Sequence, residues 1–302
     1  MIDVAIIGGG PAALGAALYV ARSGKSCTVF EKQFVGGQAS TTYEIDNYLG
    51  FPDAPSGSVL SEMMLNHVLK FDVKFRYNEV KALDLSGDIK KIFTAKKEFE
   101  AKSVILAMGA APARLDVPGE AEFSGKGVSY CATCDGMFFK DKTACVVGGG
   151  NTAIEDALYL SPIAKKVYLI HRRDEFRASP LLVDRLKECE NVDFLLKSRI
   201  TEIKGAEKLE KLIIEGSEGA FTLSTDALFV AVGTKPSADL VKDIISCDEK
   251  GFIITDEDMK TSIPGVFAAG DIRHKNLRQV ITAVSDGAIA GEEAAKYVNS
   301  LR

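Results

Sequence analysis

The sequence lacks the features that mark several large classes of protein. It has three histidines in 302 residues, and they stand far apart at His67, His171 and His274. The formal net charge is −5, so we expect no basic surface for nucleic acid. No hydrophobic run approaches the ~18 residues of a membrane helix, and no charged segment followed by an apolar run opens the chain. With 46% hydrophobic residues, the expectation is an ordinary cytoplasmic globular protein that binds neither nucleic acid nor membrane.

Six cysteines in a chain of this length do not indicate a disulfide framework, but two of them form the motif Cys131-Ala-Thr-Cys134. A zinc site would need about four ligands, and there is no second such pair. Thr133, Asp135 and Gly136 would be unusual beside a chance pair of buried thiols, and nothing indicates the secretion that favours a structural disulfide. We therefore interpret the pair as redox-active. Asp135 is placed to move the proton that thiolate chemistry requires.

The chain opens with one dinucleotide-binding pattern. Residues 3–7 are a short apolar run typical of a buried parallel strand, and Gly8-x-Gly10-x-x-Ala13 leads from it into a helix-like run. The first glycine permits a tight turn, the second lets a pyrophosphate approach the backbone, and the small third residue lets helix pack on strand. An acid at the end of the next strand is placed to bind ribose hydroxyls. The candidate contacts are Gly8, Gly10, Pro11, Ala12, Glu31 and Lys32.

A second copy of the pattern follows the cysteine motif, at Gly148-x-Gly150-x-x-Ala153. His171 stands as far after Gly148 as Glu31 stands after Gly8, and arginines follow it. An acid at this position repels a 2′-phosphate, whereas a basic cluster binds it. We therefore expect an adenine dinucleotide with a free ribose at the first site and NADP at the second. The candidate contacts are Gly148, Gly150, Asn151, Thr152, His171, Arg172, Arg173 and Arg177.

The last apolar runs predict a discontinuous domain. A strand-like run that starts at Val266 ends at Gly270-Asp271, and a helix-like run follows it. This strand and helix need a sheet to join, and the N-terminal domain is the natural host. We predict an α/β protein with two Rossmann-like three-layer (ββα) dinucleotide-binding domains, the second inserted into the first. The predicted domains are 1–113 with 245–302, and 114–244 carrying the cysteine pair.

These motifs resemble the low-molecular-weight, bacterial-type thioredoxin reductase family along nearly the whole chain. The hallmarks are Cys131-Ala-Thr-Cys134-Asp135-Gly136, His171-Arg172-Arg173-x-x-x-Arg177-Ala178 and Ala269-Gly270-Asp271. The resemblance implies FAD in the domain formed by the chain ends, NADPH and the dithiol in the inserted domain, and a homodimer. It implies a proton-donor role for Asp135. Its further FAD contacts correspond to Gly37, Gln38, Asn47, Gly109, Gly270, Asp271, Arg278, Gln279 and Val280.

The resemblance implies an NADPH-dependent thioredoxin reductase. Electrons would pass from NADPH through FAD to the Cys131–Cys134 disulfide and then to oxidised thioredoxin. Because the dithiol and Gly148 are close in sequence, one domain holds both while the other holds the flavin, so we expect that domain to rotate between half-reactions. Tyr130 stands where a small residue is common in the family, which leaves the partner open. The alternatives are reduction of a peroxiredoxin-system or glutaredoxin-like protein and, less favoured, a non-catalytic flavin redox sensor.

Overall fold

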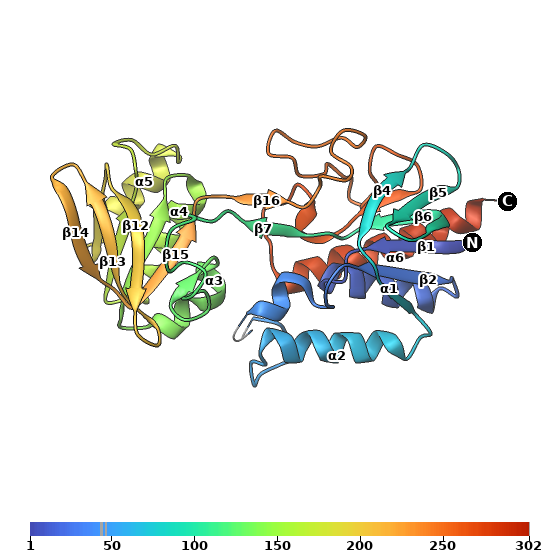
Figure 1. The fold of residues 1–302 in the computed structure, drawn as a ribbon, viewed down its shortest axis with the longest axis horizontal. Helices are drawn as coiled ribbons and strands as arrows, with labels where there is room; N and C mark the ends of the chain where they lie inside the picture. The colour runs from blue at the N-terminus through green and yellow to red at the C-terminus, as the bar shows by residue number, and fades with distance from the viewer. Residues whose placement is uncertain (43–44, 46, 302) are drawn as a thin grey trace. The chain divides into compact units, whose positions relative to one another are not determined.

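The computed structural model describes residues 1–42, 45 and 47–301. Its contacts form two compact units, of which the first combines Met1–Ala111 with Lys235–Arg302 and the second is Pro112–Thr234. The second unit is inserted into the first (Figure 1). The two connecting segments, β7 (Ala110–Pro112) and β16 (Thr234–Pro236), pair as a small sheet.

The second crossing lies earlier than the boundary after residue 244 that we expected. Ala238 and Val241 are buried and pack in one cluster with Val104 and Leu106, which belong to the sheet of the first unit. These contacts place residues 235–244 with the first unit.

The first unit contains a sheet in the order β3-β2-β1-β6-β5-β4, with β17 paired to β6. β1, β2, β3, β6 and β17 are parallel to their neighbours in that set, whereas β4, β5 and the start of β6 form an antiparallel meander. The strands are β1 (Ile2–Ile7), β2 (Cys27–Glu31), β3 (Lys74–Tyr77), β4 (Val80–Asp84), β5 (Lys90–Thr94), β6 (Glu98–Leu106) and β17 (Val266–Ala268). The helices are α1 (Pro11–Arg22), α2 (Gly57–Leu69) and α6 (Val280–Ser300), with short 3-10 turns η1 (Gly37–Thr41) and η3 (Gly270–Ile272).

Two apolar clusters make this unit three layers deep. On one face of the parallel strands, Val4 and Ile6 pack with α1 and α6. On the other face, Ile7 and Phe30 pack with residues of the meander, where the Phe30 and Phe99 rings meet edge to face at 5.1 Å. The strands are therefore covered on both sides, which is what their near-continuous hydrophobic sequence predicts.

Helices α1 and α6 approach closely because small residues line their contact. A Cβ built on Gly287 would lie 2.0 Å from the Ala12 carbonyl oxygen, and one on Gly291 would lie 2.6 Å from that of Ala16. The C-terminal helix therefore packs directly against the helix that begins at the first glycine turn. This contact brings the start of α6 and the turn η3, which contains Gly270, to the N-terminal end of α1.

The second unit has a parallel sheet in the order β11-β10-β9-β15-β8 and a separate antiparallel sheet in the order β12-β13-β14 (Figure 1). The parallel strands are β8 (Val128–Ser129), β9 (Thr143–Gly148), β10 (Lys166–Ile170), β11 (Val192–Leu195) and β15 (Ala227–Ala231). The antiparallel strands are β12 (Arg199–Gly205), β13 (Leu209–Gly216) and β14 (Gly219–Ser224). The helical segments are α3 (Ala132–Asp135), η2 (Gly136–Phe139), α4 (Asn151–Leu160) and α5 (Pro180–Lys187).

The second unit repeats the layering of the first. Val146 and Leu169 pack with α4 on one face of the parallel sheet, while Cys145 and Ile170 pack with the antiparallel strands on the other. Both units thus have the predicted ββα order, and the fold class is confirmed. Among the described residues, no helix is long and apolar enough to cross a membrane.

Candidate functional site

The two cysteines of the motif form a disulfide at the end of β8. Cys131 is the N-cap of α3, Cys134 lies in that helix, and their Cα atoms are 5.3 Å apart. Both are partly exposed, and the neighbouring Met137 is 50% exposed. The two sulfurs therefore lie near the surface of this unit, as thiol–disulfide exchange with another protein requires.

A serine that sequence reasoning missed ties the disulfide to Asp135. Ser129 is buried at 6% exposure, and its hydroxyl donates to Asp135 Oδ2 at 2.6 Å. Ser129 Oγ also accepts a hydrogen bond from the Cys131 N–H at 3.1 Å. The motif alone places Asp135 beside Cys134 in sequence, but the serine holds its carboxylate toward the start of the disulfide loop.

The glycine of the motif is needed for packing. A Cβ on Gly136 would lie 2.9 Å from Leu160 Cδ2 and 3.0 Å from Tyr159 Cε1, both on α4. The disulfide loop therefore rests on the helix that follows the second glycine turn. This packing fixes the dithiol to the framework of the second nucleotide-binding pattern.

A buried acid, also missed from the sequence, anchors the residue before the disulfide loop. Glu120 is buried at 2% exposure and accepts hydrogen bonds from the N–H groups of Leu115 and Asp116 and from the Tyr130 hydroxyl. Burial and the Glu120 charge raise the pKa of Tyr130 to about 12. The hydrogen bond from Tyr130, the residue before Cys131, to Glu120 thus connects the disulfide loop with the segment through which the chain enters the second unit.

The second glycine turn has two crowded positions and one open position. A Cβ on Gly149 would lie 2.1 Å from His171 Cε1, and one on Gly148 would lie 2.4 Å from the Ala231 carbonyl oxygen. A Cβ on Gly150 would meet no atom within 4 Å. Gly150 is the N-cap of α4 and is followed by the exposed Asn151 and Thr152, so open space lies where a phosphate approaches such a turn.

The basic loop after β10 folds back onto this turn. The Arg177 N–H donates to the Gly149 carbonyl at 2.7 Å, and the Ser179 N–H donates to Asn151 Oδ1 at 2.8 Å. Arg172, Arg173 and Arg177 are exposed, and within the part of the chain that the structure describes none of them forms an ion pair. Their charges are available to an anion beside the glycine turn.

His171 is buried, whereas the three arginines that follow it are exposed. It is 6% exposed, stacks on Phe176 with ring centroids 5.2 Å apart, and its Nε2 is 3.1 Å from the Glu175 carbonyl oxygen. Burial, aided by Arg173 and Arg177, lowers the pKa of His171. Its ring shapes the turn at Gly149, and the positive charge of the cluster comes from the arginines.

The first glycine turn repeats this arrangement. A Cβ on Gly8 would lie 2.3 Å from the Ala107 carbonyl oxygen, and one on Gly9 would lie 2.9 Å from Glu31 Oε2. Gly10 has open space around its Cα, like Gly150. Pro11 is the first residue of α1, and Lys32 is exposed beside Glu31.

The structure brings predicted flavin residues from distant parts of the chain together. A Cβ on Gly37 would lie 3.3 Å from the Gly10 Cα, and one on Gly270 would lie 2.7 Å from the Ala12 Cβ. Asn47 Nδ2 donates to Gln279 Oε1 at 3.0 Å. Further predicted contacts keep to the same unit: Gln38 in η1, Gly109 with a left-handed φ of 67° before β7, and Val280 at the start of α6.

Two of the predicted flavin contacts, Asp271 and Arg278, each have a buried polar atom without a hydrogen-bond partner among the described residues. These atoms are Asp271 Oδ1 and Arg278 Nε. Burial raises the pKa of Asp271 and lowers that of Arg278, whose guanidinium lies 4.1 Å from the Phe252 ring centroid. Unpaired buried polar atoms call for a partner. The open space at Gly10 and these two atoms fit a polar dinucleotide.

A buried ion cluster, not predicted, holds the turn that carries Asp271. Asp286 of α6 accepts from the Gly270 N–H at 3.1 Å and pairs with Arg273 at 2.9 Å and Lys275 at 2.8 Å. Asp286 is 8% exposed. The sequence signal for it is weak, because an acid in an amphipathic helix normally indicates a solvated face.

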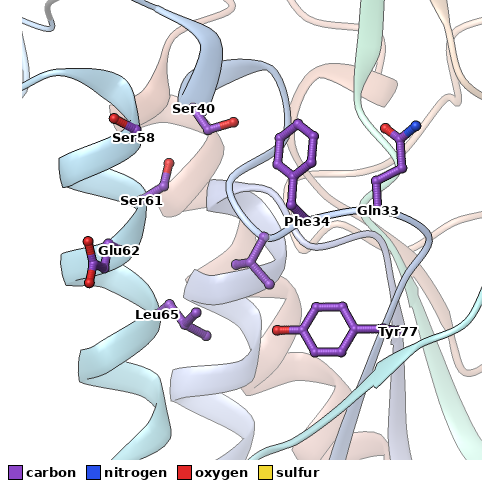
Figure 2. A pocket seen from close by; sticks show the side chains of 9 residues that line it. Gln33, Phe34, Ser40, Ser58, Ser61, Glu62, Leu65 and Tyr77 are labelled. Carbon is purple, nitrogen blue, oxygen red and sulfur yellow. The ribbon is translucent and has the colours of Figure 1, made fainter.

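A cavity of about 370 Å³ lies beside the first site, between α2 and the loop after β2 (Figure 2). Ser61 and Leu65 of α2 face Phe34 and Tyr77 across it, and Glu62 also belongs to its lining. None of the predicted flavin contacts lines it, and we assign it no ligand. Within the described residues, no group of three or more His, Cys, Asp or Glu side chains is arranged to hold a metal ion.

Comparison with known proteins agrees with this architecture. The profile of the pyridine nucleotide-disulphide oxidoreductase family matches residues 2–287. A thioredoxin reductase of Peptoclostridium acidaminophilum is 46% identical over 306 residues, which cover 99% of this chain and 97% of that protein. The crystal structure of thioredoxin reductase from Streptococcus pyogenes matches with a TM-score of 0.95 at 45% identity, covering 100% of this chain and 99% of that one. Lactococcus lactis thioredoxin reductase, in its FR conformation, matches with a TM-score of 0.70 at 41% identity, covering both chains completely.

Proposed function

The chain belongs to the pyridine nucleotide-disulphide oxidoreductase family, and from its likeness to thioredoxin reductases along nearly its whole length we propose that it reduces thioredoxin with electrons from NADPH. The observation that carries this proposal is the partly exposed Cys131–Cys134 disulfide in the same unit as the second glycine turn. Asp135, beside Cys134, moves the proton.

The first unit is the proposed FAD site and the second the proposed NADPH site. The open positions at Gly10 and Gly150 support both, and the unpaired Asp271 Oδ1 supports the flavin. When bound, the flavin supplies the two-electron chemistry that links a nicotinamide to a disulfide. The free charges of Arg172, Arg173 and Arg177 favour the 2′-phosphate of NADPH over the free ribose of NADH.

The proposed cycle includes a rotation of the second unit. The dithiol and the nicotinamide site share the second unit, whereas the flavin belongs to the first. Both must reach that flavin, so one position of the second unit cannot serve both reactions. Two relatives of nearly equal identity, 45% and 41%, give TM-scores of 0.95 and 0.70. That spread supports a family with more than one arrangement of its domains. Gly109 and Gly233, both with positive φ beside β7 and β16, are the proposed hinges.

Turnover with oxidised thioredoxin and NADPH tests the proposal. A panel that also contains a glutaredoxin-like protein and a peroxiredoxin system would identify the preferred partner. We expect thioredoxin to be reduced fastest, and the double variant C131S/C134S to reduce none of them while keeping its flavin. NADPH-dependent reduction of the flavin without turnover of any disulfide protein would support a redox sensor instead. We further propose that the protein is a cytoplasmic homodimer. Sedimentation of the purified protein would check the dimeric state.

A further inference from the structure

We propose that Ser129 is a positioning residue for Asp135 and that its hydroxyl switches between two acceptors as Asp135 gains and loses its proton. The inference rests on the proposed role of Asp135 as the proton carrier of the dithiol. It adds a residue to that role, and a mechanism by which a partly buried carboxyl group can change its charge.

The geometry supplies two acceptors for one hydroxyl. Ser129 Oγ donates to Asp135 Oδ2 at 2.6 Å, and the Cys131 carbonyl oxygen lies 3.3 Å from the same Oγ in hydrogen-bonding orientation. The Cys131 N–H donates to that Oγ at 3.1 Å. A serine hydroxyl has one proton to donate and two lone pairs to accept with, so one lone pair remains for a further donor.

In each charge state, Asp135 then has a hydrogen bond to Ser129. With Asp135 charged, the Ser129 hydroxyl donates to the carboxylate. With Asp135 protonated, the carboxyl O–H donates to Ser129 Oγ, and the Ser129 proton turns to the Cys131 carbonyl. The Cys131 N–H bond is kept in both states. Because Ser129 is 6% exposed, water is a poor substitute, and an unpaired group there would be costly.

The proton balance of the reaction gives this switch its use. When the dithiol reduces a partner disulfide, the Cys131–Cys134 bond forms, the partner's S–S bond breaks, and two electrons pass to the partner. Two protons leave the enzyme thiols and two are taken up by the partner's thiolates. Asp135 receives one proton as an enzyme thiol becomes a thiolate, and returns it to a departing sulfur. Its carboxyl group therefore changes charge twice in each turnover.

Removal of the hydroxyl tests the switch through a pH profile. The flavin-loaded enzyme would be reduced with NADPH and mixed with oxidised thioredoxin in a stopped-flow instrument, and the rate of dithiol oxidation measured against pH. Ser129→Ala removes the donor to the charged carboxylate, which then takes up a proton at higher pH. The acid limb of the profile should move upward by on the order of one pH unit. Ser129→Gly should show the same shift, and Ser129→Thr, which keeps the hydroxyl, should restore the original profile.

Tyr130→Phe is the matched control, because it removes a hydroxyl one residue away that binds Glu120. It should leave the acid limb in place. In an Asp135→Asn background, Ser129→Ala should slow the step by no more than about twofold, since residues that act through one another are not additive.

The outcomes separate the two hypotheses. An unchanged step in Asp135→Asn would overturn the role of Asp135 itself. A slowed step in Asp135→Asn with unmoved profiles in Ser129→Ala and Ser129→Gly would overturn the switch alone. An equal shift in Tyr130→Phe would also overturn it, because the effect would then belong to the loop as a whole.

Discussion

Two adjacent glycines in the second turn should fail in different ways when each is replaced by alanine. A Cβ on Gly149 would overlap the His171 ring, with Cε1 at 2.1 Å and Nδ1 at 2.4 Å. His171 is buried and stacked on Phe176, so it has little room to move. A Cβ on Gly150 meets nothing within 4 Å, and its φ of −102° suits any residue.

The magnitudes follow from this contrast. Overpacking of a filled site costs about 1–3 kcal/mol, so Gly149→Ala should lower the free energy of unfolding by that amount, and Tm by roughly 2–4 °C for each kcal/mol. Gly150→Ala should unfold at the same Tm as the parent protein. Its methyl group would stand where the pyrophosphate approaches, and the loss of one charge-assisted contact of about 1.5–3 kcal/mol should weaken NADP⁺ binding on the order of tenfold or more.

Calorimetric titration with NADP⁺ and thermal unfolding of the same samples would measure both effects. Gly10→Ala is the control in the first turn, where the Cβ also meets open space. It should reduce flavin retention and leave the NADP⁺ affinity of the remaining protein unchanged. If Gly150→Ala bound NADP⁺ as tightly as the parent, or Gly149→Ala unfolded at the parent's Tm, the account of the turn would be wrong.

Three further predictions concern the nucleotide, the dithiol and the domains. Replacing Arg172 and Arg173 with glutamine should raise KM for NADPH on the order of tenfold or more per residue, with little change for NADH. Arg199→Gln, which removes an exposed arginine already paired with Glu215, should alter neither KM; steady-state kinetics with both nucleotides would decide. Cys131→Ser should show a thiolate–flavin charge-transfer absorption band and Cys134→Ser should not, because we expect Cys134 to face the flavin; the reverse spectra would exchange the two roles. A disulfide engineered between the two units should block either flavin reduction or thioredoxin reduction, and a locked enzyme that cycles at full rate would exclude the rotation.

Much of the fold was predictable because its signals are local. Residues 3–7 and 143–147 are apolar runs followed by glycine turns, and this repeat alone indicates two Rossmann-like units. The insertion followed from a topological need, since the strand at Val266–Ala268 required a sheet to join and pairs with β6. The boundary between the units was predicted after residue 244, later than in the structure, because Ala238 and Val241 look like connecting residues until their burial is known.

The chemistry of the site was predictable where motifs carry it and not where packing does. Cys131, Cys134 and Asp135 stand in one motif, but the bond from Ser129 depends on how β8 meets α3. From the sequence, His171 was predicted to belong to a basic cluster that binds a phosphate, whereas in the structure it is buried and packs against Gly149. Glu120 and Asp286 are buried acids, and their burial depends on tertiary contacts with residues such as Tyr130 and Arg273, which sequence spacing indicates only weakly.

The electron relay is the central claim, and one optical titration tests it most directly. Purified protein should be yellow, and anaerobic addition of NADPH should bleach the flavin band. Oxidised thioredoxin added next should restore the band in the parent protein, and it should fail to do so in C131S/C134S. Recovery at the parental rate in the double variant would contradict the account, because electrons would then reach thioredoxin without passing through Cys131 and Cys134.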